Sequence, residues 1–168
     1  MNTIIDQDST PTLREGESLV YVQYDPIWSR EEVLLYTPSL TDVSNEFDGN
    51  RFERDESACP PIDYTARNCV MLIKQFGLHM YKNEIIHEMK EYGYRPAIHL
   101  EAYAFGLWKY NLLDNEYNTV ALGDFVRVRN ETYVTVLRGN EKGFRKLIVM
   151  REHRRWDAKD RFLFVREN

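Results

Sequence analysis

The apolar and polar residues between Asn83 and Tyr110 follow a pattern that predicts two short amphipathic helices. Apolar residues recur at helical spacing in both halves, at Ile85, Ile86, Met89 and Tyr92 and again at Leu100, Tyr103, Ala104, Leu107 and Trp108. Gly93-Tyr94-Arg95-Pro96 separates the halves, and glycine readily adopts the left-handed conformation that ends a helix. We therefore expect a helical pair with a hinge at residues 93–96.

Other segments have the periodicity of β-strands. Residues 18–24 alternate between apolar and polar, and residues 68–76 are apolar almost throughout, which is typical of a central strand buried on both faces. Residues 120–128, 132–137, 146–150 and 161–166 predict an antiparallel meander, with a glycine-bounded hairpin loop at 138–143. The expected fold class is α+β: a mostly antiparallel sheet with two or three short helices packed on one face.

The N-terminal third of the chain is less regular. Residues 1–17 are polar and predict a flexible tail, which leaves residues 18–168 as a single α+β domain. Ser29 is a helix N-cap candidate followed by two turns of helix at most. Residues 39–63 form either a partner-facing loop of unusual length or a loop that contains a short helix.

Composition places the chain among ordinary globular proteins. Its 168 residues are 43% hydrophobic and 29% charged, and no apolar run reaches the roughly 18 residues of a membrane span. The N-terminal residues lack the pattern of a signal peptide, and the two cysteines, Cys59 and Cys69, are too few for a disulfide scaffold. These features indicate a cytoplasmic protein that does not bind a membrane.

The net charge of −5 is divided unevenly along the chain. Residues 120–168 contain 12 Lys and Arg against 7 Asp and Glu, whereas residues 1–119 contain 10 against 20. The candidate binding residues come from the basic part: Arg127, Arg129, Arg138, Arg145, Arg151, His153, Arg154, Arg155 and Trp156. Such a set could contact an acidic protein surface or track phosphates, or it could pair with the acidic half of the same chain.

Trp156 is the most informative member of that set. It lies in the segment Arg151–Asp160, which joins two apolar strands and is therefore expected at the surface. Four basic residues surround the indole, and arginine stacks well on aromatic rings. The indole is therefore either a contact residue for a partner or a lid that folds back onto the core.

The sequence contains no recognisable catalytic, metal or cofactor motif. The four histidines do not form an H-E-x-x-H pair, and the cysteines lack the spacing of a zinc deaminase. No P-loop, dinucleotide fingerprint or nucleophile elbow is present. We predict no catalytic residue, no metal ligand and no cofactor. One alternative is a divalent-metal nuclease whose carboxylates are Asp114, Glu116 and Asp124, and the other is that these are ordinary solvated carboxylates.

Three sequence motifs resemble a group of uncharacterised proteins. GYRPAIHLEAYAFG at 93–106, VALGDF at 120–125 and the Trp-Asp of 156–157 before RFLFVRE at 161–167 are similar to proteins found in bacteria, phages and mobile elements. The resemblance covers residues 65–168 and implies a ligand-binding fold similar to C-type lectins. This chain differs from the pattern at Ile98, where the group has a threonine cap, and at Asp124, where it has a serine.

Together these features predict a non-enzymatic protein-binding module, an accessory protein of a phage or mobile element for which inhibition of a host defence complex is one role. The expected partner is a protein, and the oligomeric state is left open. The alternative is a nucleic-acid-binding protein or divalent-metal nuclease that uses the basic C-terminal sheet.

Overall fold

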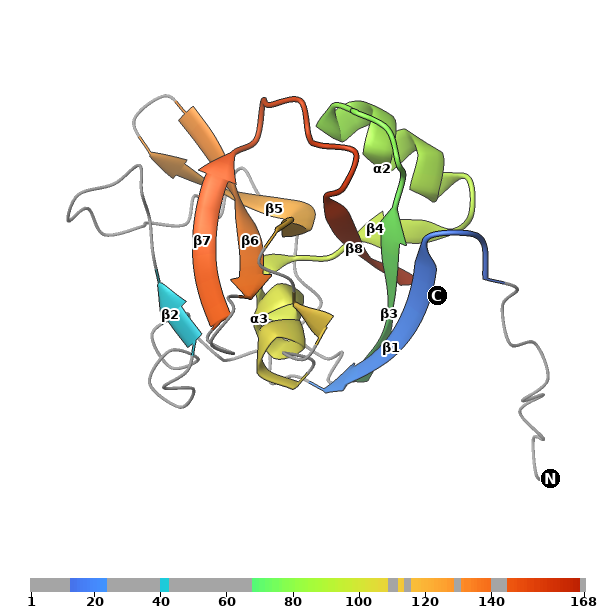
Figure 1. Cartoon of the computed structure of the whole chain (residues 1–168), viewed down its shortest axis with the longest axis horizontal. Helices are drawn as coiled ribbons and strands as arrows, with labels where there is room; N and C mark the ends of the chain where they lie inside the picture. Colours follow the sequence, from blue (N-terminus) through green and yellow to red (C-terminus); the bar gives the residue numbers. More distant parts are fainter. Residues whose placement is uncertain are drawn as a thin grey trace, which may run out of the picture.

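The computed structural model describes residues 13–23, 40–42, 68–108, 112–113, 116–128, 131–139 and 145–166. In chain order these residues form β1 Glu17–Gln23, β2 Leu40–Asp42, β3 Asn68–Gln75, α2 Lys82–Lys90, β4 Tyr94–Pro96, α3 His99–Trp108, β5 Thr119–Val128, β6 Glu131–Gly139, β7 Arg145–Arg151 and β8 Arg161–Arg166 (Figure 1). The predicted α+β class, the helical pair and the strand at 68–76 are confirmed.

Some predicted features cannot be compared with the described residues, and the expected tail can be compared only in part. The helix after Ser29, most of residues 39–63, Cys59 and the centre of the 138–143 hairpin loop lie outside the described residues. Of the expected tail, residues 13–17 are described and form a turn at Gly16, where the guanidinium of Arg14 lies 3.5 Å from the centre of the Tyr92 ring. In the described part of the chain, no helix is long and apolar enough to cross a membrane.

The strands form one sheet in the order β1-β3-β8-β5-β6-β7-β2, with β4 also paired to β8. Most pairs are antiparallel, but β8 runs parallel to β5, and β2 runs parallel to β7. The predicted meander is correct for β5, β6 and β7 and wrong for β8, which lies between β3 and β5. Four consecutive buried residues, Phe162–Val165, need cover on both faces, and only an interior position in the sheet provides it.

The two helices lie on opposite faces of this sheet, not on one face as expected. Phe162 and Phe164 of β8 pack in the same core cluster as Ile85 and Met89 of α2. Leu163 and Val165 point the other way, into the cluster that contains the buried residues of α3. The short strand β4 explains the difference, because it lies within the sheet between the two helices and carries the chain from one face to the other.

Helix α3 is enclosed by the sheet. Residues 101–106 are all buried, and α3 contacts β1, β5 and β6, which are spread across the sheet. Figure 1 shows α3 between β6 and β7 on one side and β1 on the other. The sheet therefore curls around α3, while α2 covers part of its outer face.

A β-bulge in β5 brings the sheet close to the start of α3. The β5–β6 register shifts between Ala121 and Val126, and within this interval the Gly123 N–H donates to the Ala97 carbonyl at 2.9 Å. A Cβ atom at Gly123 would lie 2.6 Å from the Pro96 carbonyl oxygen and 2.7 Å from that of Ala97. Only glycine fits this approach, and the bulge turns the next residue, Asp124, towards α3.

Candidate functional site

An antiparallel bridge between Met80 and Trp156 joins the connection before α2 to the connection before β8. The backbone N–H of Trp156 donates to the backbone carbonyl of Met80 at 2.9 Å. The Trp156 side chain is fully buried and meets Phe162 edge-on, with ring centres 6.0 Å apart at 89°. Met80 packs against the same cluster, so the bridge is anchored in the core.

The prediction that Trp156 itself contacts a partner is wrong, because its indole is part of the core. The guanidinium of Arg154 lies 5.1 Å from the centre of the indole ring, and its Nη1 is 3.7 Å from the Met150 sulfur. Arg154 therefore covers the buried ring instead of presenting it. The alternative interpretation, in which the tryptophan closes over the core, is the one that the structure supports.

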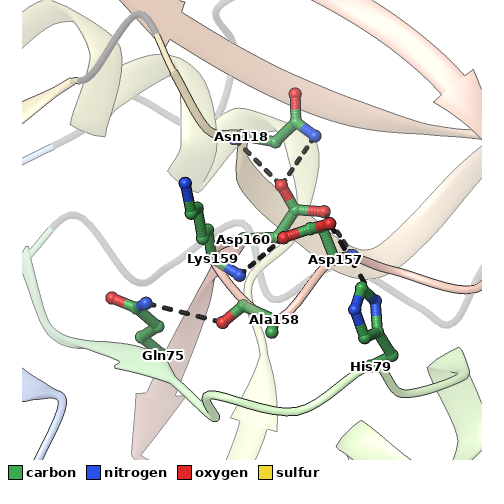
Figure 2. A network of polar contacts seen from close by, with 7 residues as sticks. All are labelled: Gln75, His79, Asn118, Asp157, Ala158, Lys159 and Asp160. Carbon is green, nitrogen blue, oxygen red and sulfur yellow. Dashed lines mark hydrogen bonds and ion pairs between the residues drawn. The ribbon is translucent and has the colours of Figure 1, made fainter.

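The residues beside the bridge point outward because side chains alternate along extended chains. Continuing the antiparallel register by one residue places Tyr81 opposite Arg155 on one side and His79 opposite Asp157 on the other. Tyr81 is 54% exposed, Arg155 is exposed, and the His79 Nδ1 lies 3.9 Å from the Asp157 Oδ2 (Figure 2).

We call this region the Tyr81–Arg155 surface. Its members are exposed side chains from the two bridged connections: Leu78, His79, Tyr81, His153, Arg155 and Asp157. Leu78 is 67% exposed, which is unusual for a large apolar side chain. The surface thus combines apolar, aromatic and basic groups.

Polar contacts fix the turn Asp157–Asp160, which follows Trp156 and carries Asp157 of this surface (Figure 2). The Asp160 Oδ1 accepts hydrogen bonds from the Asn118 backbone N–H at 3.1 Å and from its side-chain amide at 2.8 Å. The Asp160 Oδ2 accepts from the Asp157 N–H at 3.0 Å, and the Asp157 Oδ1 accepts from the Lys159 N–H at 2.9 Å. The Gln75 amide donates to the Ala158 carbonyl at 3.4 Å. These contacts hold the turn in one conformation.

An ion pair supports the surface at its other end. Lys82, at the start of α2, pairs with Glu152, and both side chains are largely buried. Burial alone would raise the pKa of Glu152, but the hydrogen bond from Lys82 and the nearby positive charge of Lys82 hold the pKa below its ordinary value. Beside this pair lies a depression of about 270 Å³ lined by Tyr81, Lys82, Asn83, Glu152 and His153.

The candidate basic residues do not form one patch. Arg151, His153 and Arg155 are exposed together at one end of the sheet, where the Arg151 Nε lies 3.9 Å from the Glu131 Oε2. Arg138 and Arg145 lie at the far end of the β6–β7 pair, about 20 Å away at the usual rise per residue.

Arg138 and Arg127 have defined neighbours in the sheet. The Arg138 Nε donates to the Asn118 Oδ1 at 2.5 Å. Arg127 pairs with Thr132 in register, at the same end of the sheet as Arg151. The side chains of Arg127 and Arg145, and the whole of Arg129, lie outside the described residues.

Sequence reasoning missed the contribution of residues 78–81. The available signal was the alternation His79-Met80-Tyr81, in which one apolar residue, Met80, points inward and its neighbours point outward. The pattern is too short to predict a strand by itself, and its partner is 76 positions further along the chain.

A second polar cluster lies at the start of α3 and has a structural role. The Asp124 Oδ1 accepts the His99 backbone N–H at 2.8 Å, and its Oδ2 contacts the His99 Nδ1. The Glu101 Oε2 accepts the Ile98 N–H at 2.9 Å. Asp124 and Glu101 thus satisfy backbone donors at a helix start where Ile98 has no capping group.

This arrangement bears on the nuclease alternative. Asp124 is 2% exposed, and both of its carboxylate oxygens contact His99. Glu116 is exposed, and Asp114 lies outside the described residues. Among the residues that the structure describes, no three His, Cys, Asp or Glu side chains are grouped to hold a metal ion. Asp124 is therefore a capping residue for α3 and not an open metal ligand.

Comparisons with protein-family models, curated proteins and solved structures find no match to this chain.

Proposed function

We propose that the protein is a non-enzymatic binding module that contacts a partner protein through the Tyr81–Arg155 surface. The observation that carries the proposal is the Met80–Trp156 bridge, which sets an exposed tyrosine beside an exposed arginine on a buried foundation. Tyrosine and arginine are among the residues that contribute most to protein interfaces. Because the bridge and the buried Trp156 fix the backbone beside Tyr81 and Arg155, little backbone entropy is lost when a partner binds.

The chemistry of the surface indicates the kind of partner. Leu78 and Tyr81 offer apolar contact area, and Arg155, opposite Tyr81, offers positive charge. A complementary surface presents an apolar or aromatic side chain flanked by carboxylates. Resemblance to phage and mobile-element proteins supports an accessory role, such as binding a host defence complex.

Nucleic acid is the second candidate, and the neighbouring Tyr81 and Arg155 favour it, since an aromatic ring can stack on a base while an arginine contacts phosphate. Two features favour a protein. Asp157 lies within the surface and Glu131 lies beside Arg151, so local positive charge is partly balanced. The chain also has a net charge of −5, which opposes binding to a polyanion.

The test is affinity capture from host lysates with matched variants. The wild-type chain is compared with Tyr81→Ala and Arg155→Glu, and the control variants Tyr92→Ala and Arg166→Glu change exposed residues of the same types elsewhere. We expect a stoichiometric protein partner with the wild type and both controls, and its loss with both surface variants.

A gel-shift series run in parallel separates the two candidates. Binding of single-stranded or duplex oligonucleotides that falls steeply with salt and is lost in Arg155→Glu would favour nucleic acid. A captured protein that binds all variants equally would contradict the proposed surface.

A further inference from the structure

Strand β1 lies at the edge of the sheet, and half of its backbone N–H and C=O groups point away from its neighbour β3. Within the described part of the chain, β1 pairs with β3 alone (Figure 1). The Gln75 N–H donates to the Gly16 carbonyl at 2.9 Å, which sets the alternation of the antiparallel ladder. Ser18, Val20 and Val22 then bond to β3, and the N–H and C=O groups of Leu19 and Tyr21 point outward.

The Glu17 backbone confirms this alternation. Its N–H belongs to the outward set and donates to the Arg14 carbonyl at 3.1 Å, in the turn before the strand. The first outward N–H, that of Glu17, is therefore bonded within the turn. The next outward N–H groups are those of Leu19 and Tyr21.

The outer edge of β1 lacks the features that normally block edge pairing. Natural edge strands are protected by charged side chains, prolines, bulges or short length. Residues 18–23 contain no charged residue and no proline, and the β1–β3 register runs without a bulge over seven pairs. The Tyr21 side chain is 75% exposed on the face that also carries Leu19.

We propose that a second copy of this chain pairs with β1, antiparallel, around a two-fold axis at Val20. This register sets Leu19 opposite the partner's Tyr21, so that each pair can exchange two backbone hydrogen bonds and one aliphatic–aromatic contact. Glu17 falls opposite the partner's Gln23, and no like charges oppose each other between Glu17 and Gln23. An isologous contact of this kind is self-complementary.

The small area of one strand pair makes this dimer weak and dependent on concentration. The inference is independent of the proposed function, because it rests on the backbone of β1 and its test needs no other protein. Sedimentation velocity of the purified chain from micromolar to millimolar concentration measures it. We expect the mass to rise towards that of two chains.

A proline at Tyr21 gives a selective variant. The Tyr21 N–H points outward, so Tyr21→Pro removes an edge donor without removing a β1–β3 hydrogen bond. We expect this variant to remain monomeric. Tyr21→Ala keeps the donor and loses only the side chain, so we expect it to dimerise with affinity reduced about tenfold or less.

Two further measurements keep the inference open to refutation if Tyr21→Pro folds poorly. Tyr21→Lys leaves the backbone intact and places two like charges at the contact, so we expect it to weaken dimerisation. Amide hydrogen exchange at Leu19 and Tyr21 should slow as concentration rises. A wild type that is monomeric at millimolar concentration would overturn the inference, whether those amides exchange freely or are protected by the chain's own residues.

Discussion

Arg95 and Glu101 form a two-pronged ion pair across the start of α3, with N–O distances of 2.9 and 2.7 Å. Glu101 is fully buried, and one of its oxygens also accepts the Ile98 N–H. Both residues belong to the Gly93–Gly106 motif that prompted the family resemblance. Their role is to anchor the central helix, so this motif specifies structure.

Removing Arg95 should destabilise the fold. Arg95→Ala leaves the Glu101 carboxylate buried with one compensating hydrogen bond, from Ile98. We expect a loss of about 3 kcal/mol in the free energy of unfolding, at the low end for a buried pair because Arg95 is itself one-third exposed. Urea denaturation measures the loss, and Arg166→Ala, at an exposed end of β8, is the control. Equal stability of the two variants would show that the pair does not anchor α3.

Adding a methyl group at Gly123 should also destabilise the fold. The new Cβ atom in Gly123→Ala meets two backbone carbonyl oxygens at less than 3 Å, and neither can move without shifting the start of α3. We expect a loss of about 3 kcal/mol, as for severe overpacking. The matched control is Gly93→Ala, where φ is +74° but nothing lies within 4 Å of the new atom, so the expected cost is about 1–2 kcal/mol. A reversed order of the two losses would contradict the close approach.

Truncating Trp156 separates the core from the contact surface. Because the indole is fully buried, Trp156→Ala should reduce the free energy of unfolding by about 3–5 kcal/mol. Arg155→Glu changes an exposed side chain and should alter stability by less than about 0.5 kcal/mol. Thermal or urea unfolding of both variants checks this. If Trp156→Ala is as stable as the wild type, the indole does not belong to the core.

The Lys82–Glu152 pair gives the fold a pH dependence. The pKa of Glu152 is lower in the folded chain than its ordinary value of 4.5, so the pair contributes stability at pH values above 4.5. This contribution is lost as pH falls from 4.5 through the lowered pKa. We expect the stability difference between wild type and Glu152→Gln to be present at neutral pH and to shrink below pH 4.5. A difference that is unchanged at acidic pH would contradict the pairing.

Local sequence patterns predicted the elements well and their partners less well. The run at 68–76 and the hinge at Gly93 are encoded in neighbouring residues, and both predictions are confirmed. The position of β8 between β3 and β5 depends on pairing with residues more than 40 positions away. The opposite placement of α2 and α3 follows from the pairing of β4 with β8, which three residues of sequence do not reveal.

The candidate site shows the same limit. The exposed positions Arg151, His153 and Arg155 were found because charged residues in a connection between strands are normally solvated. For Trp156 the sequence allows two interpretations, because the choice between them depends on its bridge to Met80. The same bridge brings Tyr81 into the site, and no local signal in the basic segment points to it.

The most direct test of the account is the affinity of the captured partner for the purified wild type, Arg155→Glu and the control Arg166→Glu, measured by isothermal titration calorimetry. The Tyr81–Arg155 surface predicts that Arg155→Glu weakens binding at least about 30-fold, as expected for the loss of an interface residue worth 2 kcal/mol. Arg166→Glu should bind as the wild type does, and all three chains should unfold at the same temperature. Equal affinities for the wild type and Arg155→Glu would contradict the central claim.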